Sequence, residues 1–233
     1  MGLGVSQGHR VTIRAEGDDA AAAYVFKDDV FDKLLPALAL VQPVLGGGQQ
    51  VGNGVATDNY IHALLWSGTA ASAVDLDPKP FTSSGAFGTD GKQQVGFEQT
   101  GNAITGFHAH AMLWSGTADS AVDLHEGPLA ESFSGSIAYG VGGGQQVGDL
   151  ANSSPTETHA ALWSGTAASV IDLHPSDAQG STAYATDGHI QVGYSISFPP
   201  SFATHARLWK GTAASSIDLD SLLPSDLNNS AAY

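Results

Sequence analysis

The sequence predicts an all-β protein folded as a five-bladed β-propeller. One phrase, His-Ala-x-Leu-Trp followed by Ser or Lys and then Gly-Thr-Ala, occurs four times, with its tryptophans at Trp66, Trp114, Trp163 and Trp209. A repeat of nearly constant length indicates one supersecondary unit that is used several times. The 29 glycines and 10 prolines suit many short strands joined by turns. The end of the chain also matches the start of a repeat, which predicts that the array closes into a ring.

Each complete repeat predicts four antiparallel strands, as the third repeat illustrates. We expect its first strand over 136–141 and, after a glycine turn, its second strand from Gln145. The third strand is expected over 159–163 and the fourth over 170–173, with a turn over 164–169 between them. Short runs rich in β-forming residues, separated by glycine-containing turns, are typical of an antiparallel meander.

The second and fourth strands carry signatures of their own. Gln-Val-Gly marks the second strand at 50–52, 94–96, 146–148 and 191–193. An aspartate nine residues after each tryptophan marks the fourth strand, at Asp75, Asp123, Asp172 and Asp218.

The N-terminal residues predict a fifth, degenerate repeat, in which Ala22–Phe26 stands in place of the third strand. The C-terminal segment Ser230–Tyr233 resembles the first strand at Ser136–Tyr139. We therefore expect a single domain over residues 1–233 with five repeats of about 40–52 residues. Its ring would be closed by the C-terminal strand pairing into the N-terminal blade, which removes free sheet edges. The alternative architecture is an open β-solenoid, which would not need a terminal half-repeat.

The phrases His-Ala-x-Leu-Trp, Val-Asp-Leu and Gly-Gln-x-Val-Gly resemble the HAF-type repeats of bacterial exported proteins. The resemblance covers about residues 46–220, with Leu64, Ala161 and Arg207 standing where that family favours Phe. It implies a β-propeller-like repeat and an extracellular or cell-envelope location. It implies no catalytic residues and no known ligand.

Composition excludes several classes of partner. The net charge is −15, from 23 acidic and 8 basic residues, which argues against nucleic acid and against anionic membrane surfaces. The simplest interpretation is that the net negative charge keeps the protein soluble. The chain has no cysteine, so thiolate metal sites and disulfides are excluded. Its start lacks the basic and apolar regions of a signal segment, and its most apolar stretch, 34–45, is too short to span a bilayer. We expect a monomer without membrane insertion.

The recurring histidines His62, His110, His159 and His205 suggest a metal ring, but we predict a structural role. Each shares a face of its strand with a tryptophan, and that face packs on a neighbouring blade. We expect each histidine to bond a buried backbone group or the repeated aspartate, because a buried carboxylate needs a partner. The glutamines of Gln-Val-Gly are expected to satisfy backbone groups between blades. No cofactor and no metal site are predicted, although calcium remains open because the chain is acidic.

The connections differ in how much they vary between repeats. First-to-second and third-to-fourth turns are nearly constant, whereas second-to-third and fourth-to-first connections vary. Because strand direction alternates, all the variable connections lie at the same ends of the strands, which we call one edge of the sheets. Variable loops carried by a fixed scaffold are the expected place for binding. The candidate ligand-binding residues are Tyr60, Phe107, His108, Glu157, Phe198 and Phe202. Polar residues of the fourth-to-first connections, among them Asp77, His125, His174 and Asp220, complete this expected binding edge.

Three functions are compatible with these patterns. The first is a non-enzymatic binding module for a glycan or an exported protein, because aromatic rings beside amides and carboxylates suit a sugar. The second is a purely structural or assembly module. The third is a glycoside-processing hydrolase, which needs two carboxylates. The predicted inner strands, such as Ser136–Tyr139, contain no acid, so no catalytic residue is assigned.

Overall fold

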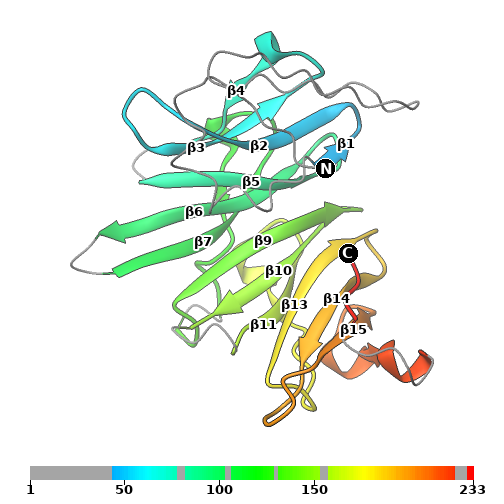
Figure 1. The fold of residues 1–233 in the computed structure, drawn as a ribbon. Helices are drawn as coiled ribbons and strands as arrows, with labels where there is room; N and C mark the ends of the chain where they lie inside the picture. The colour runs from blue at the N-terminus through cyan, green and yellow to red at the C-terminus, as the bar shows by residue number, and fades with distance from the viewer. Residues whose placement is uncertain (1–43, 78–81, 103–105, 129–130, 153–156, 224–229) are drawn as a thin grey trace, which may run out of the picture. The chain divides into compact units, whose positions relative to one another are not determined.

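The computed structural model describes residues 44–77, 82–102, 106–128, 131–152, 157–223 and 230–233, which lie in one compact unit, Pro43–Tyr233. These residues form four sheets of four strands, each with its strands in chain order (Figure 1). We number the sheets, and the strands within each sheet, in chain order.

The first sheet contains β1 (Val44–Gly46), β2 (Gln49–Val55), β3 (Ile61–Trp66) and β4 (Val74–Asp75). The second contains β5 (Ser83–Thr89), β6 (Gln94–Asn102), β7 (Gly106–Trp114) and β8 (Val122–Asp123). The third contains β9 (Gly135–Gly142), β10 (Gln145–Ala151), β11 (His159–Trp163) and β12 (Ile171–Asp172). The fourth contains β13 (Gly180–Thr186), β14 (Gln191–Ile196), β15 (Thr204–Trp209) and β16 (Ile217–Asp218). Short 3-10 turns are η1 (Ala70–Ser72), η2 (Ala118–Ser120), η3 (Ala167–Ser169), η4 (Ala213–Ser215) and η5 (Asp220–Leu222).

The predicted all-β meander is confirmed in every described repeat. In the third sheet, β10 pairs antiparallel with both β9 and β11, and β11 pairs with β12. The other three sheets repeat this order. Strand direction alternates, so the second-to-third and fourth-to-first connections share one edge of each sheet, as the variable loops predicted.

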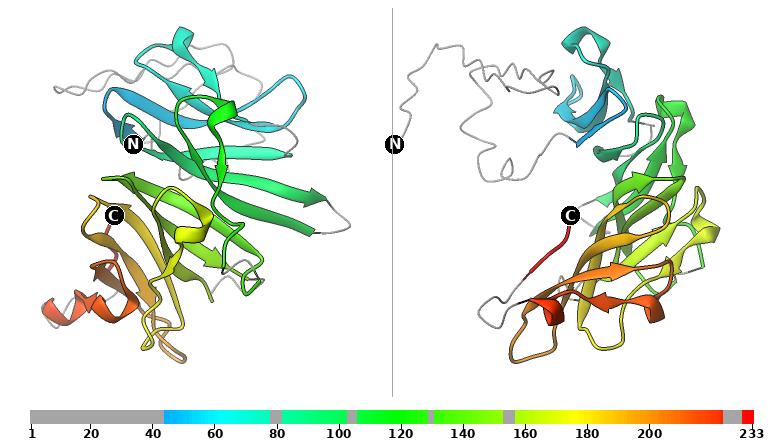
Figure 2. Two further views of the ribbon diagram at one scale, coloured as in Figure 1. Left: turned by 180° about the vertical axis from the view of Figure 1, so that it is seen from behind. Right: turned by 90° about the vertical axis from the view of Figure 1, so that its right-hand side faces the viewer.

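The predicted closed five-bladed propeller is wrong. The described residues form four separate four-stranded sheets, and none of these sheets closes on itself. Among the described residues, the C-terminal segment bonds the fourth sheet: Ser230 N donates to Thr204 O and Ala232 N to Gly193 O. Figure 2 shows these residues, in red, beside the fourth sheet. The degenerate repeat expected at the N-terminus lies outside the described residues.

Each fourth strand is only two residues long, and this controls how neighbouring sheets meet. In the second sheet, β8 pairs with Met112 and Leu113 of β7. The first half of β7 is therefore not paired with β8. The first strand of the following sheet packs there, and the same arrangement joins the first to the second sheet and the third to the fourth.

The glutamines of Gln-Val-Gly fix the turns between third and fourth strands. The side-chain oxygen of Gln146 accepts from Gly165 N at 2.7 Å, and its amide nitrogen donates at 3.2 Å to Gln93, in the turn between β5 and β6. Gln94 has the equivalent partners Gly116 and Gln49, and Gln191 has Gly211 and Gln145. The predicted role is therefore half correct: the backbone group lies in the same sheet, and the contact between sheets joins two glutamines.

The glycine of Gln-Val-Gly is required where the second strand meets an irregular first strand. The register between β9 and β10 shifts at Val147 and Gly148. A Cβ at Gly148 would lie 1.8 Å from the Ile137 carbonyl oxygen. Gly96 and Gly193 are equally confined, which explains why this residue recurs.

Apolar side chains pack between adjacent sheets. Trp114, Trp163 and Trp209 are fully buried, and one cluster joins Val95 of the second sheet to Ala138 and Trp163 of the third. The indole nitrogen of Trp163 donates to Leu124 O across this junction. No helix in the described part of the chain is long and apolar enough to cross a membrane.

Candidate functional site

All four recurring histidines bond the aspartate of the neighbouring fourth strand. Nδ1 lies 2.8 Å from Asp75 in His62, 2.7 Å from Asp123 in His110, 2.8 Å from Asp172 in His159 and 3.0 Å from Asp218 in His205. The predicted His–Asp pairing is confirmed. Burial alone would raise the pKa of Asp123 and Asp172, but the bonds from His110 and His159 and from backbone N–H groups hold both below the usual value.

A serine is the second residue of β5, β9 and β13 and joins each of these strands to the preceding sheet, and Ser230 makes the same contact from the C-terminal segment. We call Ser84, Ser136, Ser181 and Ser230 the junction serines. Their hydroxyl oxygens accept the backbone N–H of Ala63, Ala111, Ala160 and Ala206, at 2.8 to 2.9 Å. Each of these alanines directly follows a recurring histidine, so the His-Ala pair of the repeat serves both the sheet and the junction.

Each junction serine has a second partner, two residues after the repeated aspartate. This acceptor position holds Asp77, His125, His174 and Asp220 in the four repeats. Its backbone N–H donates to the repeated aspartate, at 2.7 Å for His125. Sequence patterns placed these residues at a ligand-binding edge, but their side chains hold the junctions between sheets.

At the second and third junctions the acceptor position places two imidazoles against each other. The rings of His110 and His125 have centroids 4.4 Å apart, and those of His159 and His174 are stacked at 4.0 Å with 13° between their planes. Burial lowers the pKa of His125 and of His174, and a charge on the neighbouring histidine lowers each further. Both rings are therefore held neutral at pH 7.

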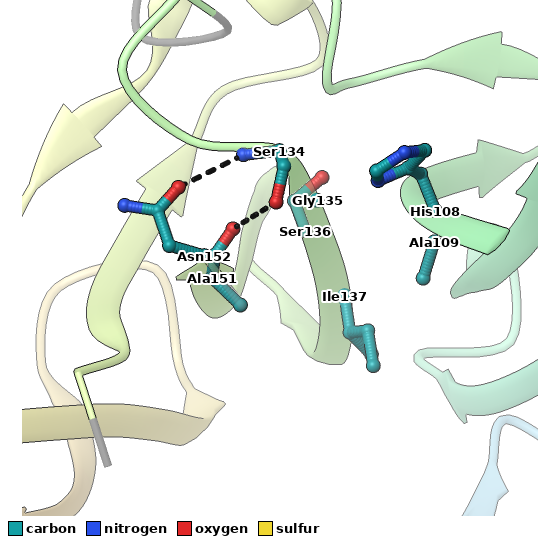
Figure 3. A pocket seen from close by; sticks show the side chains of 8 residues that line it. All are labelled: His108, Ala109, Ser134, Gly135, Ser136, Ile137, Ala151 and Asn152. Carbon is teal, nitrogen blue, oxygen red and sulfur yellow. Dashed lines mark hydrogen bonds between the residues drawn. The ribbon is translucent and has the colours of Figure 1, made fainter. Parts of the chain in front are cut away.

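A pocket of about 150 Å³ opens where the second and third sheets meet (Figure 3). It is lined by His108, Ala109, Ser134, Gly135, Ser136, Ile137, Ala151 and Asn152. In Figure 3, His108 and Ala109 of β7 lie on one side of the start of β9, and Ala151 and Asn152 lie on the other. Ser134 N donates to Asn152 Oδ1 at 3.1 Å, which fixes the side chain of Asn152.

The pocket brings one of the six predicted ligand-binding residues, His108, together with polar groups from two sheets. Tyr60 lies in the loop between β2 and β3 and is 49% exposed. Phe198 and Phe202, 54% and 49% exposed, lie in the loop between β14 and β15. Glu157 is exposed before β11. The side chain of Phe107 is outside the described part of the structure. The described candidate residues therefore lie at the expected edge, but they are spread over several sheets.

Sequence reasoning missed the pocket residue Ser134, whereas Asn152 lies in a second-to-third connection, where binding was expected. It also missed a row of aromatic rings at the fourth position of each Ser-x-Ala-Phe or Ser-x-Ala-Tyr strand. Phe87, Tyr139, Tyr184 and Tyr233 contact in order, with ring centroids 5.7, 5.1 and 5.1 Å apart. The recurrence was visible in the sequence, but the contact between strands 45 or more residues apart was not.

Two buried carboxyl groups are not among the residues that line the pocket. Glu98, on β6, is fully buried, and neither of its oxygens has a hydrogen-bond partner among the described residues. Burial, with the charges of Asp77 and Asp123, raises the pKa of Glu98 to about 9. Burial also raises the pKa of Asp149 to about 7, although hydrogen bonds from Thr182 and Tyr139 oppose the shift. Within the described ranges, no group of three His, Cys, Asp or Glu side chains is placed to hold a metal ion.

Comparison with known proteins adds little to this picture. No protein-family model matches the chain, so the resemblance to HAF-type repeats stays a prediction, and no curated protein matches it in sequence. Among solved structures, TolB from Acinetobacter baumannii is similar at a TM-score of 0.49 and 9% identity, over 75% of this chain and 41% of that one. The chain thus spans less than half the length of that structure, and a likeness this distant carries no conclusion about function.

Proposed function

We propose that this chain is a non-enzymatic binding module that holds a polar ligand at the edge carrying its variable loops. The ligand class is a glycan, of which one sugar unit enters the pocket. The observation that carries the proposal is the pocket between the second and third sheets, which His108 lines together with Ser134 and Asn152.

The size and lining of the pocket support a small polar group. Sites for whole drug-sized ligands measure roughly 300–1,000 Å³, so about 150 Å³ suits one ring or side chain of a larger ligand. Polar partners come from His108, Ser134 and Asn152, and apolar contact comes from Ile137 and two alanines. Half-exposed Phe198 and Phe202 lie at the same edge of the fourth sheet and would contact more distant parts of the ligand.

The same lining gives no support to a hydrolase. Retaining and inverting glycosidases use two carboxyl groups beside the scissile bond, and the pocket is lined by none. Glu98 has the raised pKa of a general acid, but it is fully buried and is not among the pocket residues. An exported location, suggested by the resemblance to HAF-type repeats, is part of the proposal and fits a glycan ligand.

A glycan array at pH 7.5 tests the proposal with the wild type, His108→Ala and Asn152→Ala. The matched control is His189→Ala, an exposed histidine in the turn between β13 and β14, at the opposite edge of the sheets. We expect both pocket variants to lose at least tenfold in binding while the control keeps it. A bound glycan that is insensitive to both pocket variants, or an array without any bound glycan, would overturn the proposal.

A further inference from the structure

The contacts of His174 define which of its nitrogens carries the proton. Nε2 lies 3.1 Å from the Ala178 carbonyl oxygen, and Nδ1 lies 2.9 Å from the Ser181 hydroxyl oxygen. A carbonyl oxygen can only accept, so Nε2 carries the hydrogen. In the neutral ring, Nδ1 is then an acceptor, and the hydroxyl of Ser181 donates to it.

The first and fourth junctions also have an acceptor at this position. Asp77 and Asp220 accept the hydroxyl of Ser84 and Ser230 with a carboxylate oxygen. At the second junction, His125 Nδ1 lies 3.0 Å from Ser136 Oγ, which already accepts Ala111 N–H at 2.9 Å. A neutral imidazole or a carboxylate can accept the serine hydroxyl hydrogen, whereas an imidazolium cannot, because both of its nitrogens are donors.

The second junction is also a wall of the pocket, because Ser136 lines it. We propose that protonation of His125 releases Ser136 and opens the second junction, so that mild acid abolishes ligand binding at the pocket. The part concerning binding rests on the proposed function. The part concerning the junction does not depend on it.

The surroundings of His125 determine when this occurs. The ring of His110 from β7 lies against that of His125, tilted by 34°, and an imidazolium at His125 would face it at 4.4 Å. Burial and the charges of His110 and His108 lower the pKa of His125, and Asp123 on β8 opposes them. Glu98 on β6 lies near Asp123 and is held protonated at neutral pH, so it adds no compensating charge. Exposed Glu126 is the next residue along the chain. The pKa of His125 is therefore lowered from its usual value of 6.5, so the ring is neutral at neutral pH and gains its proton only in acid.

Within the chain, the four junctions provide matched controls. The third junction uses His174 and should respond to acid as the second does. The first and fourth use Asp77 and Asp220, whose carboxyl groups keep an oxygen that can accept the serine hydroxyl in either protonation state. A carboxylate at position 125 would provide the same kind of acceptor that Asp77 provides at the first junction.

Hydrogen exchange of four backbone amides, compared at pH 7.5 and 5.0 without ligand, tests the junction directly. We expect the protection factors of Ala111 and Ala160 to fall at least tenfold at pH 5.0, and those of Ala63 and Ala206 to change less than threefold. His125→Asp should give Ala111 the behaviour of Ala63, while Ala160 still responds to acid. His125→Asn, which offers an uncharged acceptor oxygen, provides a second variant if the added carboxylate impairs folding. Unchanged protection at Ala111, or the same acid response in both variants as in the wild type, would overturn the proposal.

The glycan array repeated at pH 5.0 tests the effect on binding. Wild type should lose its bound glycan at pH 5.0, and His125→Asp should keep it. Equal binding by wild type at both pH values would overturn the proposed effect of acid on binding while leaving the proposed function intact. An array without binding at either pH would overturn the proposed function, and the protection of Ala111 would then decide the junction by itself.

Discussion

Replacing Glu98 by glutamine should stabilise the protein at neutral pH, by an amount that depends on pH. Glu98 is fully buried without a hydrogen-bond partner among the described residues, and its pKa is raised from 4.5 to about 9. Between these two pH values the unfolded chain releases this proton and the folded protein keeps it. The unfolded state therefore gains relative stability as pH rises from 4.5 towards 9.

The magnitude follows from the size of that gap. Each pH unit above 4.5 costs the folded state about 1.4 kcal/mol, which amounts to about 3 kcal/mol at pH 7. Glutamine keeps the shape and has no proton to release, so Glu98→Gln removes the pH-dependent cost. Glu98→Leu should stabilise further, because the third sheet has the buried Leu150 at the equivalent position.

Urea unfolding of wild type and Glu98→Gln at pH 4.5, 7.0 and 8.5 measures the effect. The difference between the two proteins should increase in favour of the variant by about 3 kcal/mol from pH 4.5 to 7.0 and increase further at pH 8.5. Glu157→Gln, an exposed site, is the control and should change stability by less than about 0.5 kcal/mol. A constant difference between wild type and Glu98→Gln at all three pH values would refute the reasoning.

Three further outcomes can be checked by the same unfolding measurement. Gly148→Ala should cost about 3 kcal/mol or more, because its Cβ would meet the Ile137 carbonyl at 1.8 Å, whereas Gly144→Ala, with open space and a φ of +80°, should cost about 1–2 kcal/mol. Ser181→Ala should cost about 1–3 kcal/mol, because Ala160 N–H and His174 lose their partner, and exposed Ser176→Ala should be nearly neutral. His62→Gln should destabilise the protein more at pH 5.5 than at pH 8.5. Burial lowers the pKa of His62, but the bond to Asp75 and the charges of Asp77, Asp75 and Asp58 outweigh it, so the pKa is raised in the folded protein. The stabilisation by charged His62 is therefore present in acid and is lost as pH rises through the pKa of the folded state.

The strands and pairings within one repeat could be predicted because four copies show which residues are constant. His62–Asp75 and its three counterparts are partners on adjacent strands of one sheet, so strand order and alternation suffice to place them together. Glycine after Gln-Val was visible as a constant residue, but its reason was not. The shift in register at Gly148 depends on the path of β9, which no single strand reveals.

The closed ring could not be predicted from the similarity of Ser230–Tyr233 to a first strand. A first strand makes two kinds of contact, with its own second strand and with the preceding sheet. Ser230 makes the second kind, with Ala206 and Thr204, and this contact forms whether or not a ring exists. The residues at the acceptor position were misjudged for a related reason. Asp and His in a loop predict exposure and ligand contact, but His125 is buried because the following sheet, with Ser136, packs against it.

The most direct test of the central claim, that each junction serine donates to an acceptor two residues after the repeated aspartate, is the tautomer of His125 and His174. Long-range proton–nitrogen NMR spectra of the imidazoles at pH 7.5 report which ring nitrogen carries hydrogen. We predict that both rings are neutral, with hydrogen on Nε2 and an unprotonated Nδ1 facing Ser136 and Ser181. Hydrogen on Nδ1 in either ring, or a charged imidazolium at this pH, would contradict the account of how the sheets are joined.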